Sequence, residues 1–177
     1  MLKHATNHTQ KRCAQGGKPK PQIMRQTVLL ISILISFSCF SQEPNDSDKI
    51  KVKKVVNEFF ESLNKQDTIL YKKILLLDGQ IWSINNSTKS SSLSMRFFRD
   101  DIETFNPDEI WEEIPLSFDI KIHNGIAMAW VPYEFKVNSE FTHCGIDIFT
   151  LAETNEGWKI INASYTIYLD GCNELKN

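Results

Sequence analysis

Hydrophobic and polar positions alternate along the last third of the chain in four runs, which are joined by short turns. The runs span Ser117 to His123, Ile126 to Val137, Glu140 to Leu151 and Trp158 to Tyr168. A period of two is typical of β-strands that bury one face. Asn124-Gly125, between the first two runs, is a strong signal for a two-residue hairpin turn. The pattern therefore predicts a four-stranded antiparallel meander.

The chain before the meander carries helical periodicity instead. Apolar residues at i, i+3, i+4, i+7, i+8 and i+11, starting at Val52, predict a helix from Lys49 to Gln66. Asp67 is placed to cap a second, shorter helix that runs to about Leu76. Alternation from Gln80 to Asn85 then predicts a short strand.

A third helix is predicted from a cap at Ser92 to a stop at Asn106-Pro107, because the residue before a proline disfavours helical backbone. The predicted order is therefore helix, helix, strand, helix and meander. This order indicates an α+β domain with its helices on one face of the sheet.

Pairing the runs through their turns sorts the meander into two faces. We expect Tyr133 to pair with Cys144, and Ile148 with Ala163. The predicted core face holds Leu116, Phe118, Ile120, Ile122, Ala127, Ala129, Val131, Tyr133, Phe135, Cys144, Ile146, Ile148, Ile161, Ala163, Tyr165 and Ile167. The predicted outer face holds Ser117, Asp119, Lys121, His123, Met128, Trp130, Glu134, His143, Asp147, Phe149, Asn162 and Ser164. A slip by one residue would exchange the sets and bury carboxylates, which is costly.

Three motifs carry a resemblance to a known family. They are Trp130-Val131-Pro132-Tyr133-Glu134-Phe135, His143-Cys144-Gly145 and Gly157-Trp158-Lys159-Ile160. Together with the long first helix, they resemble the nuclear-transport-factor-2-like superfamily, and most of all its exported bacterial proteins labelled "putative lumazine-binding". The resemblance covers Lys49 to Cys172. It implies a cystatin-like cone, in which a curved antiparallel sheet wraps an N-terminal helix with two shorter helices.

The resemblance also implies a pocket inside the cone. We expect it to be lined by Trp82, Arg96, Phe97, Tyr133, Phe135, Cys144 and Tyr165. Isomerase-like members hold an acid on the inner face, and near that position our faces place Ile146 and Ile148, so the acid is expected to be missing. We therefore interpret the chain as a binder of a small apolar or aromatic molecule, with catalytic residues unknown.

Two alternatives of other classes stay open. One is an enzyme of the isomerase or hydrolase type that uses Tyr133 or Tyr165 with Asp78, and the other is a structural dimer with a filled cone. A buried acid in the pocket would favour the enzyme, an apolar empty pocket the binder, and no pocket the structural protein.

Other reactive side chains do not form a predicted site. His143 and Glu134 look like a base with its orienting carboxylate, but both fall on the predicted outer face. Cys144 cannot pair with its neighbour His143, because adjacent strand residues point to opposite faces. His123 and His143 lack the spacing of metal ligands, so no metal and no cofactor is expected.

The predicted outer face also carries three large apolar side chains, those of Met128, Trp130 and Phe149. A contiguous apolar patch of this kind is typical of a protein–protein interface. The sequence therefore predicts a symmetric homodimer packed sheet to sheet. The alternative is that the tail past Gly171, or a crossing loop, covers the patch within one chain.

The N-terminal region predicts export. Thr27 to Cys39 is an apolar run too short to span a bilayer with ease, and Cys39-Phe40-Ser41 ends it with small residues. We expect a signal peptide cleaved after Ser41, and a periplasmic or secreted product. A membrane anchor, a lipid on Cys39 and a true start at Met24 are the alternatives.

This leader divides the chain into residues 1–41 (leader), 42–48 (a polar lead-in), 49–172 (the domain) and 173–177 (a tail). Six of the 20 basic residues and none of the 22 acidic residues precede Gln42, so the mature part has a net charge of −8. Such a domain is a poor nucleic-acid binder, because phosphate contacts dominate that affinity. Cys144 and Cys172 remain as an even pair, either bonded or as two thiols.

Overall fold

The computed structural model describes residues 46–106, 108–170 and 172–176. The predicted leader, its cleavage point and the lipid site at Cys39 lie outside the described residues. The elements are α2 (Asp46–Asn64), α3 (Thr68–Ile74), β1 (Leu75–Asn85), β2 (Ser92–Phe97), α4 (Phe98–Asp101), β3 (Trp111–Pro115), β4 (Asp119–His123), β5 (Ile126–Val137), β6 (Glu140–Thr154), β7 (Gly157–Ile167) and the 3-10 helix η1 (Cys172–Lys176).

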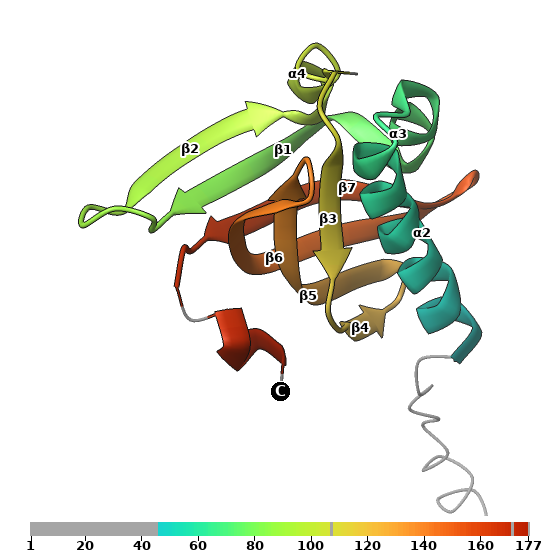
Figure 1. Ribbon diagram of the computed structural model, residues 1–177. Helices are drawn as coiled ribbons and strands as arrows, with labels where there is room; N and C mark the ends of the chain where they lie inside the picture. Colours follow the sequence, from blue (N-terminus) through green and yellow to red (C-terminus); the bar gives the residue numbers. More distant parts are fainter. Residues whose placement is uncertain (1–45, 107, 171, 177) are drawn as a thin grey trace, which may run out of the picture. The chain divides into compact units, whose positions relative to one another are not determined.

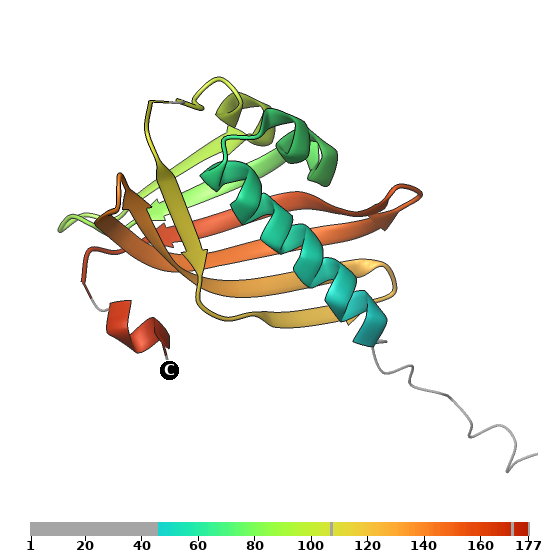
Figure 2. The same cartoon turned by 45° about the vertical axis from the view of Figure 1, so that its right-hand side comes forward.

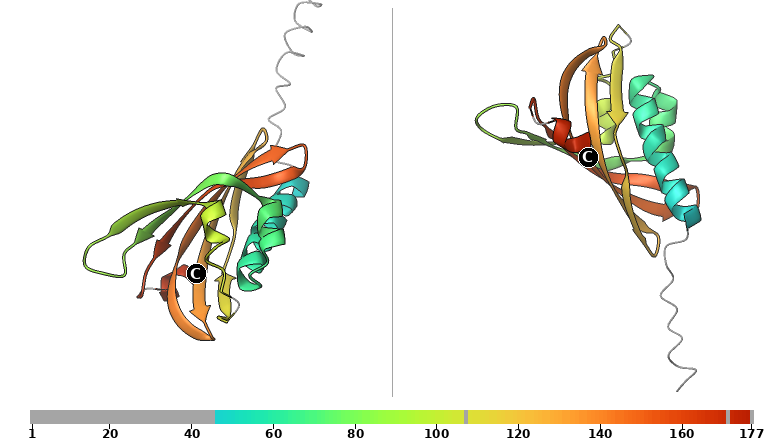
Figure 3. Two further views of the ribbon diagram at one scale, coloured as in Figure 1. Left: turned by 90° about the horizontal axis from the view of Figure 1, so that it is seen from above. Right: turned by 60° about the horizontal axis from the view of Figure 1, so that its bottom comes forward.

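The strands form one seven-stranded sheet in the order β2-β1-β7-β6-β5-β3, and β4 pairs with the first half of β5 (Figure 1). Only the β1–β7 pair is parallel within this described sheet. The sheet is curved, and α2 crosses its concave face (Figure 2). Figure 3 shows α2 and η1 on opposite sides of the sheet. The predicted α+β class is confirmed.

Helix α2 is stabilised because its apolar stripe packs against this concave face. Val52 and Val56 are fully buried, and the rings of Phe59 and Phe60 meet that of Phe149 at centroid distances of 5.0 and 5.9 Å. The predicted cap of the next helix is also present, since the Asp67 carboxylate accepts hydrogen bonds from two backbone N–H groups at the start of α3.

The predicted third helix is wrong. Ser92 to Phe97 form strand β2, which pairs with β1 from Gln80↔Phe97 to Asn85↔Ser92, and only Phe98–Asp101 are helical. Pairing with β1 satisfies the backbone of this segment and overrides its helical periodicity. The strand Trp111–Pro115 was not predicted, and it pairs antiparallel with the second half of β5.

A β-bulge reverses the predicted faces of β6. The β5–β6 hairpin starts as predicted, with Val137 opposite Glu140, but the register shifts after Lys136↔Phe141 so that Phe135 pairs with His143. Thr142 is the extra residue. Tyr133 therefore faces Gly145 rather than Cys144, and every later side chain of β6 changes face.

The core shows the result of this shift. Asp147 and Phe149 are buried at 5% and 1% exposure, whereas Ile146 and Ile148 are only partly buried on the outer side. A second register shift, between β6 and β7, likewise replaces Ile161 in the core by Ile160. The inner faces of β5 and of the second half of β7 are as predicted.

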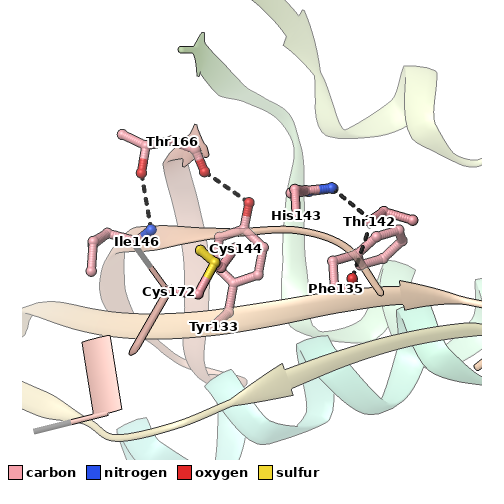
Figure 4. Close-up of a disulfide and its surroundings, with 8 residues drawn as sticks. All are labelled: Tyr133, Phe135, Thr142, His143, Cys144, Ile146, Thr166 and Cys172. Carbon is pink, nitrogen blue, oxygen red and sulfur yellow. Dashed lines mark hydrogen bonds between the residues drawn. A yellow bond between two sulfur atoms is a disulfide. The ribbon is translucent and has the colours of Figure 1, made fainter. Parts of the chain in front are cut away.

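Cys144 and Cys172 are joined by a disulfide, with their Cα atoms 5.8 Å apart. The tail folds back through an isolated bridge between Cys144 and Tyr168, and η1 then packs on the outer side of β5 and β6. The bond thus holds the tail against the sheet face opposite to α2 (Figures 3 and 4).

Candidate functional site

A cavity of about 310 Å³ lies between α2, α4 and the concave face of the sheet. Seven of its lining side chains are aromatic, and they come from helix, loop and sheet. The lining residues are Phe59, Leu63, Ile81, Arg96, Asp101, Thr104, Phe105, Trp111, Glu113, Tyr133, Phe135, His143, Asp147, Phe149, Ala163, Tyr165 and Ile167.

Four of the seven residues expected in the pocket line this cavity: Arg96, Tyr133, Phe135 and Tyr165. The other three, Trp82, Phe97 and Cys144, are not among its lining residues. Each of them directly follows a lining residue on its strand, and side chains of adjacent strand residues point to opposite faces.

Arg96, on β2, forms an ion pair and a hydrogen bond with neighbouring side chains. Its guanidinium forms an ion pair with Asp101 of α4, with Nη2 3.2 Å from Oδ2, and Nη1 donates to the Tyr165 hydroxyl at 3.1 Å. The hydroxyl of Tyr71 donates to the same Asp101 oxygen at 2.9 Å, and burial raises the pKa of this tyrosine. Asp101 therefore offsets the charge of Arg96 at the cavity wall.

Two carboxyl groups also line the cavity. Glu113 comes from β3 and Asp147 from β6, on either side of β5, and the two side chains are close enough that each changes the pKa of the other. Burial raises the pKa of Glu113 to about 7, and burial with the charge of Glu113 raises that of Asp147 well above its usual value. The pair therefore holds a shared proton near neutral pH.

This pair corrects the expectation that the inner face lacks an acid. Asp147 lies on the inner face because of the bulge at Thr142, and Glu113 belongs to the strand that the pattern did not reveal. The sequence held one sign of this. Apolar residues occupy every second position of β6 from Cys144 to Ile148 but shift by one position at Phe149, so the pattern is compatible with either set of β6 side chains facing the core. Asp78, which we considered for this role, is exposed and forms an ion pair with Arg99.

His143 also lines the cavity, in contrast to its predicted place on the outer face. In the strand register Glu134 lies opposite Cys144, whereas His143 lies opposite Phe135. Its ring is tilted against that of Phe135 at 5.0 Å and meets the edge of Tyr133 at 5.8 Å. Burial lowers the pKa of His143, so the imidazole is neutral at pH 7.

The tautomer of His143 follows from Thr142 (Figure 4). The Thr142 hydroxyl donates its one hydrogen to the Phe135 carbonyl at 3.1 Å, and the same oxygen lies 2.8 Å from Nδ1 of His143. Nδ1 must therefore carry the hydrogen of the second bond. This leaves Nε2 as a hydrogen-bond acceptor.

The described part of the chain holds no cluster of three or more His, Cys, Asp or Glu side chains that could bind a metal ion. None of the helices in the same part has the length and apolar character needed to cross a membrane.

Comparison with known proteins gives one family and many similar folds. The sequence profile of the family described as "Putative lumazine-binding" matches residues 47–166. No curated protein matches the chain significantly.

Solved structures share its fold at low identity. An NTF2-like protein of unknown function from Shewanella baltica is 11% identical, with a TM-score of 0.54 over 73% of this chain and 100% of its own. A cystatin-like protein of unknown function from Nostoc punctiforme is 14% identical, with a TM-score of 0.55 over 71% and 95%. A protein from Streptomyces avermitilis, described as a "putative dehydratase from the NTF2-like family", is 11% identical, with a TM-score of 0.54 over 72% and 100%. At these identities the likeness shows the fold alone.

Proposed function

Because the chain belongs to the family described as "Putative lumazine-binding", within the nuclear-transport-factor-2-like superfamily, we propose that it binds a small, partly aromatic molecule inside its cone. The cavity of about 310 Å³, walled by aromatic rings and reached by a few polar groups, carries this proposal. Its size is at the lower end of small-molecule sites, which are mostly apolar with few polar groups. A cavity of this kind argues against the alternative of a filled cone.

The aromatic wall suits a flat molecule. Trp111 meets Phe105 and Phe135 edge to face at centroid distances of 6.0 and 6.4 Å, so these rings hold one another in place. Tyr133 is held by the hydrogen bond from its hydroxyl to the Thr166 carbonyl at 2.8 Å. A wall of mutually packed rings loses little side-chain entropy when a ligand binds.

A cavity-filling variant tests the binding role. Ala163 lines the cavity and is 5% exposed, so Ala163→Leu should fill part of the space and Ala163→Val less of it. The probe is N-phenyl-1-naphthylamine, an uncharged aromatic dye that fluoresces in apolar sites. We expect the fluorescence rise to weaken from wild type to Val to Leu, in proteins whose circular dichroism is unchanged.

Thr150→Leu is the matched control, because Thr150 lies on the outer face of β6 between the buried residues Phe149 and Leu151. It should bind the dye as the wild type does. Equal binding by the Leu variant at position 163 would contradict a ligand site in this cavity.

A second candidate is an enzyme that moves protons, and the paired acids Glu113 and Asp147 favour it. An ionised carboxyl of the pair would take a proton from a carbon beside a carbonyl, and the acid formed would return it to another carbon. The probe is 2-tetralone in D₂O, whose exchange of acidic C–H protons NMR follows. Exchange should exceed the buffer rate, rise with pH, and fall to the buffer rate in the double variant Glu113→Gln with Asp147→Asn, which leaves no carboxyl of the pair. An unchanged rate in that variant would exclude this role.

Export and assembly also belong to the proposal. The apolar run Thr27 to Cys39 supports cleavage after Ser41 and release to the periplasm or medium. Mass spectrometry of the protein from its natural producer should find a chain that starts near Gln42; a retained leader or a lipid on Cys39 would contradict this. The outer sheet face supports a homodimer through Met128 and Trp130, without Phe149, which is buried in the core.

A further inference from the structure

The buried carboxylate of Asp147 is incompletely satisfied. The residue is 5% exposed and lines the cavity, yet no N–H or O–H of the described residues donates to its Oδ2. A buried carboxylate oxygen without a donor is costly, so a bond from elsewhere must complete it. The available sources are a proton held between Asp147 and Glu113, a water molecule in the cavity, or the N–H of a ligand that displaces this water.

The hydrogen-bond donors around the cavity are largely committed elsewhere. Arg96 directs all three of its nitrogens to Asp101 and Tyr165. The hydroxyl of Tyr133 donates to Thr166, and the indole N–H of Trp111 donates to Glu109 at 2.9 Å. The groups left for a ligand are chiefly acceptors, namely the two carboxyls and Nε2 of His143. The Tyr165 hydroxyl is the one remaining donor among these groups.

The cavity also carries an unbalanced negative charge. Arg96 and Asp101 offset each other, and although the charge of Arg96 also lowers the pKa of Glu113, no ion pair within the described residues includes Glu113 or Asp147. With one shared proton, the acid pair keeps one negative charge beside an aromatic wall. An unpaired charge in such surroundings favours either a second proton or a bound cation.

We propose that the part of the cavity around Glu113 and Asp147 recognises a flat monocation with adjacent N–H donors, of the amidinium or protonated amino-heterocycle class. Two parallel N–H groups match the fork geometry in which carboxylates bind guanidinium-like groups. The aromatic wall contacts the faces of the ring, and cations of this kind are also attracted to aromatic faces. This inference rests on the proposed binding function and specifies its ligand.

Three probes of one shape test the ligand class: benzamidine, a cation; benzamide, its neutral analogue; and benzoate, an anion. Titration of the folded protein, followed by NMR, gives the three dissociation constants. We expect benzamidine to bind at least tenfold more tightly than benzamide, and benzoate to bind most weakly. The N-phenyl-1-naphthylamine dye should be displaced by benzamidine.

Isosteric variants locate the site. The double variant Glu113→Gln with Asp147→Asn keeps shape and removes the negative charge, which a single substitution would leave on the other carboxyl, so it should weaken benzamidine binding at least tenfold and leave benzamide nearly unchanged. Glu112→Gln is the matched control, because Glu112 is the neighbour of Glu113 on β3 and does not line the cavity. It should bind benzamidine as the wild type does.

The pH dependence supplies an independent readout. The groups facing the acid pair are His143 of β6, Arg96 of β2, Asp101 of α4, Tyr133 of β5 and Tyr165 of β7. Benzamidine stays protonated throughout the physiological range, so its affinity should fall on acidification as the pair gains its second proton. Binding near neutral pH should also release a proton, which calorimetry in buffers of different ionisation enthalpy detects.

The outcomes separate the ligand class from the binding role. If benzamide or benzoate binds as tightly as benzamidine, or if the double variant leaves benzamidine binding unchanged, the proposed class is wrong while the cavity remains a ligand site. If neither the dye nor any of the three probes binds to the wild type, the binding role itself is contradicted along with the class.

Discussion

Gly145 leaves the space that the ring of Tyr133 needs to pass β6 in the aromatic wall. A Cβ at this position would lie 1.8 Å from the Thr166 carbonyl oxygen and 2.9 Å from Cε1 of Tyr133. Without a side chain, β6 allows the ring of Tyr133 to cross it and donate to β7 (Figure 4). The position thus requires glycine for space rather than for backbone freedom.

Gly145→Ala should therefore destabilise the protein by about 3 kcal/mol, since the added methyl meets backbone as well as a ring. Gly157→Ala is the comparison, because its φ is +100° but nothing lies within 4 Å of the added atom. Its cost should be the left-handed backbone penalty alone, about 1 kcal/mol. Urea denaturation measures both, and equal costs would show that the crossing of Tyr133 does not constrain position 145.

The acid pair predicts how stability depends on pH. The pKa of Glu113 is raised from 4.5 to about 7 by burial, so the folded state holds this proton more tightly than the unfolded chain. The stabilisation is fully present below the unfolded value and is lost as pH rises through the folded one. Between about pH 5 and pH 8, the wild type should lose roughly 2 kcal/mol from this source.

The double variant Glu113→Gln with Asp147→Asn removes both titrating groups. Its free energy of unfolding, relative to the wild type, should therefore increase from about pH 5 to about pH 8. His143 has a lowered pKa and acts in the opposite direction, but it is present in both proteins and cancels in the comparison. A difference that stays constant with pH would contradict the raised pKa values.

At the scale of elements, β6 serves both faces of the sheet. Its inner side supplies His143 and Asp147 to the cavity, and its outer side supplies Cys144 to the disulfide with η1. Backbone hydrogen bonds in both directions between Cys144 and Tyr168, at 3.0 and 2.8 Å, hold the end of β7 beside the bond. The disulfide therefore fixes the tail without entering the cavity.

Reduction of this disulfide should lower the free energy of unfolding by about 3 kcal/mol, as expected for a cross-link between residues 28 apart in sequence. The double variant Cys144→Ala with Cys172→Ala should not respond to a reductant. Ligand binding should persist in both proteins, because Cys144 does not line the cavity. Denaturation with and without reductant tests this, and equal stabilities of the wild type would contradict it.

At the scale of the whole molecule, the outer sheet face carries an exposed apolar surface. Trp130 is 42% exposed there, beside a groove of about 470 Å³ that also includes Ile146, Ile148 and residues of η1. The tail therefore covers part of the apolar patch, and the remainder is available to a second copy of the chain.

We propose that the domain dimerises through this face, so Trp130→Asp should convert a dimer to a monomer in sedimentation velocity. Phe141→Asp is the control, because Phe141 is 48% exposed on β6 outside the groove. It should leave the dimer intact. A monomeric wild type, or a dimer that survives Trp130→Asp, would remove this face as the interface.

The elements that local interactions decide could be predicted from the sequence. The stripe of α2 needs only a 3.6-residue period, and the Asp67 cap acts within three residues. Asn124-Gly125 forms the predicted turn, with φ of +44° and +78°, because these residues tolerate left-handed backbone. With the order of elements, these features were sufficient for the α+β class, whereas the fold family followed from the resemblance of the motifs Trp130 to Phe135, His143 to Gly145 and Gly157 to Ile160.

Only the tertiary structure decided the site. The face of a strand depends on how many residues separate it from its turn, so one extra residue at Thr142 turned Asp147 and His143 inward. Glu113 reaches Asp147 from a strand on the other side of β5, 34 positions away in the chain. Likewise, Ser92 to Phe97 became a strand because β1 offered backbone partners. Bulges and edge pairings are set by non-local hydrogen bonds, and the local hydrophobic pattern carries no information about these bonds.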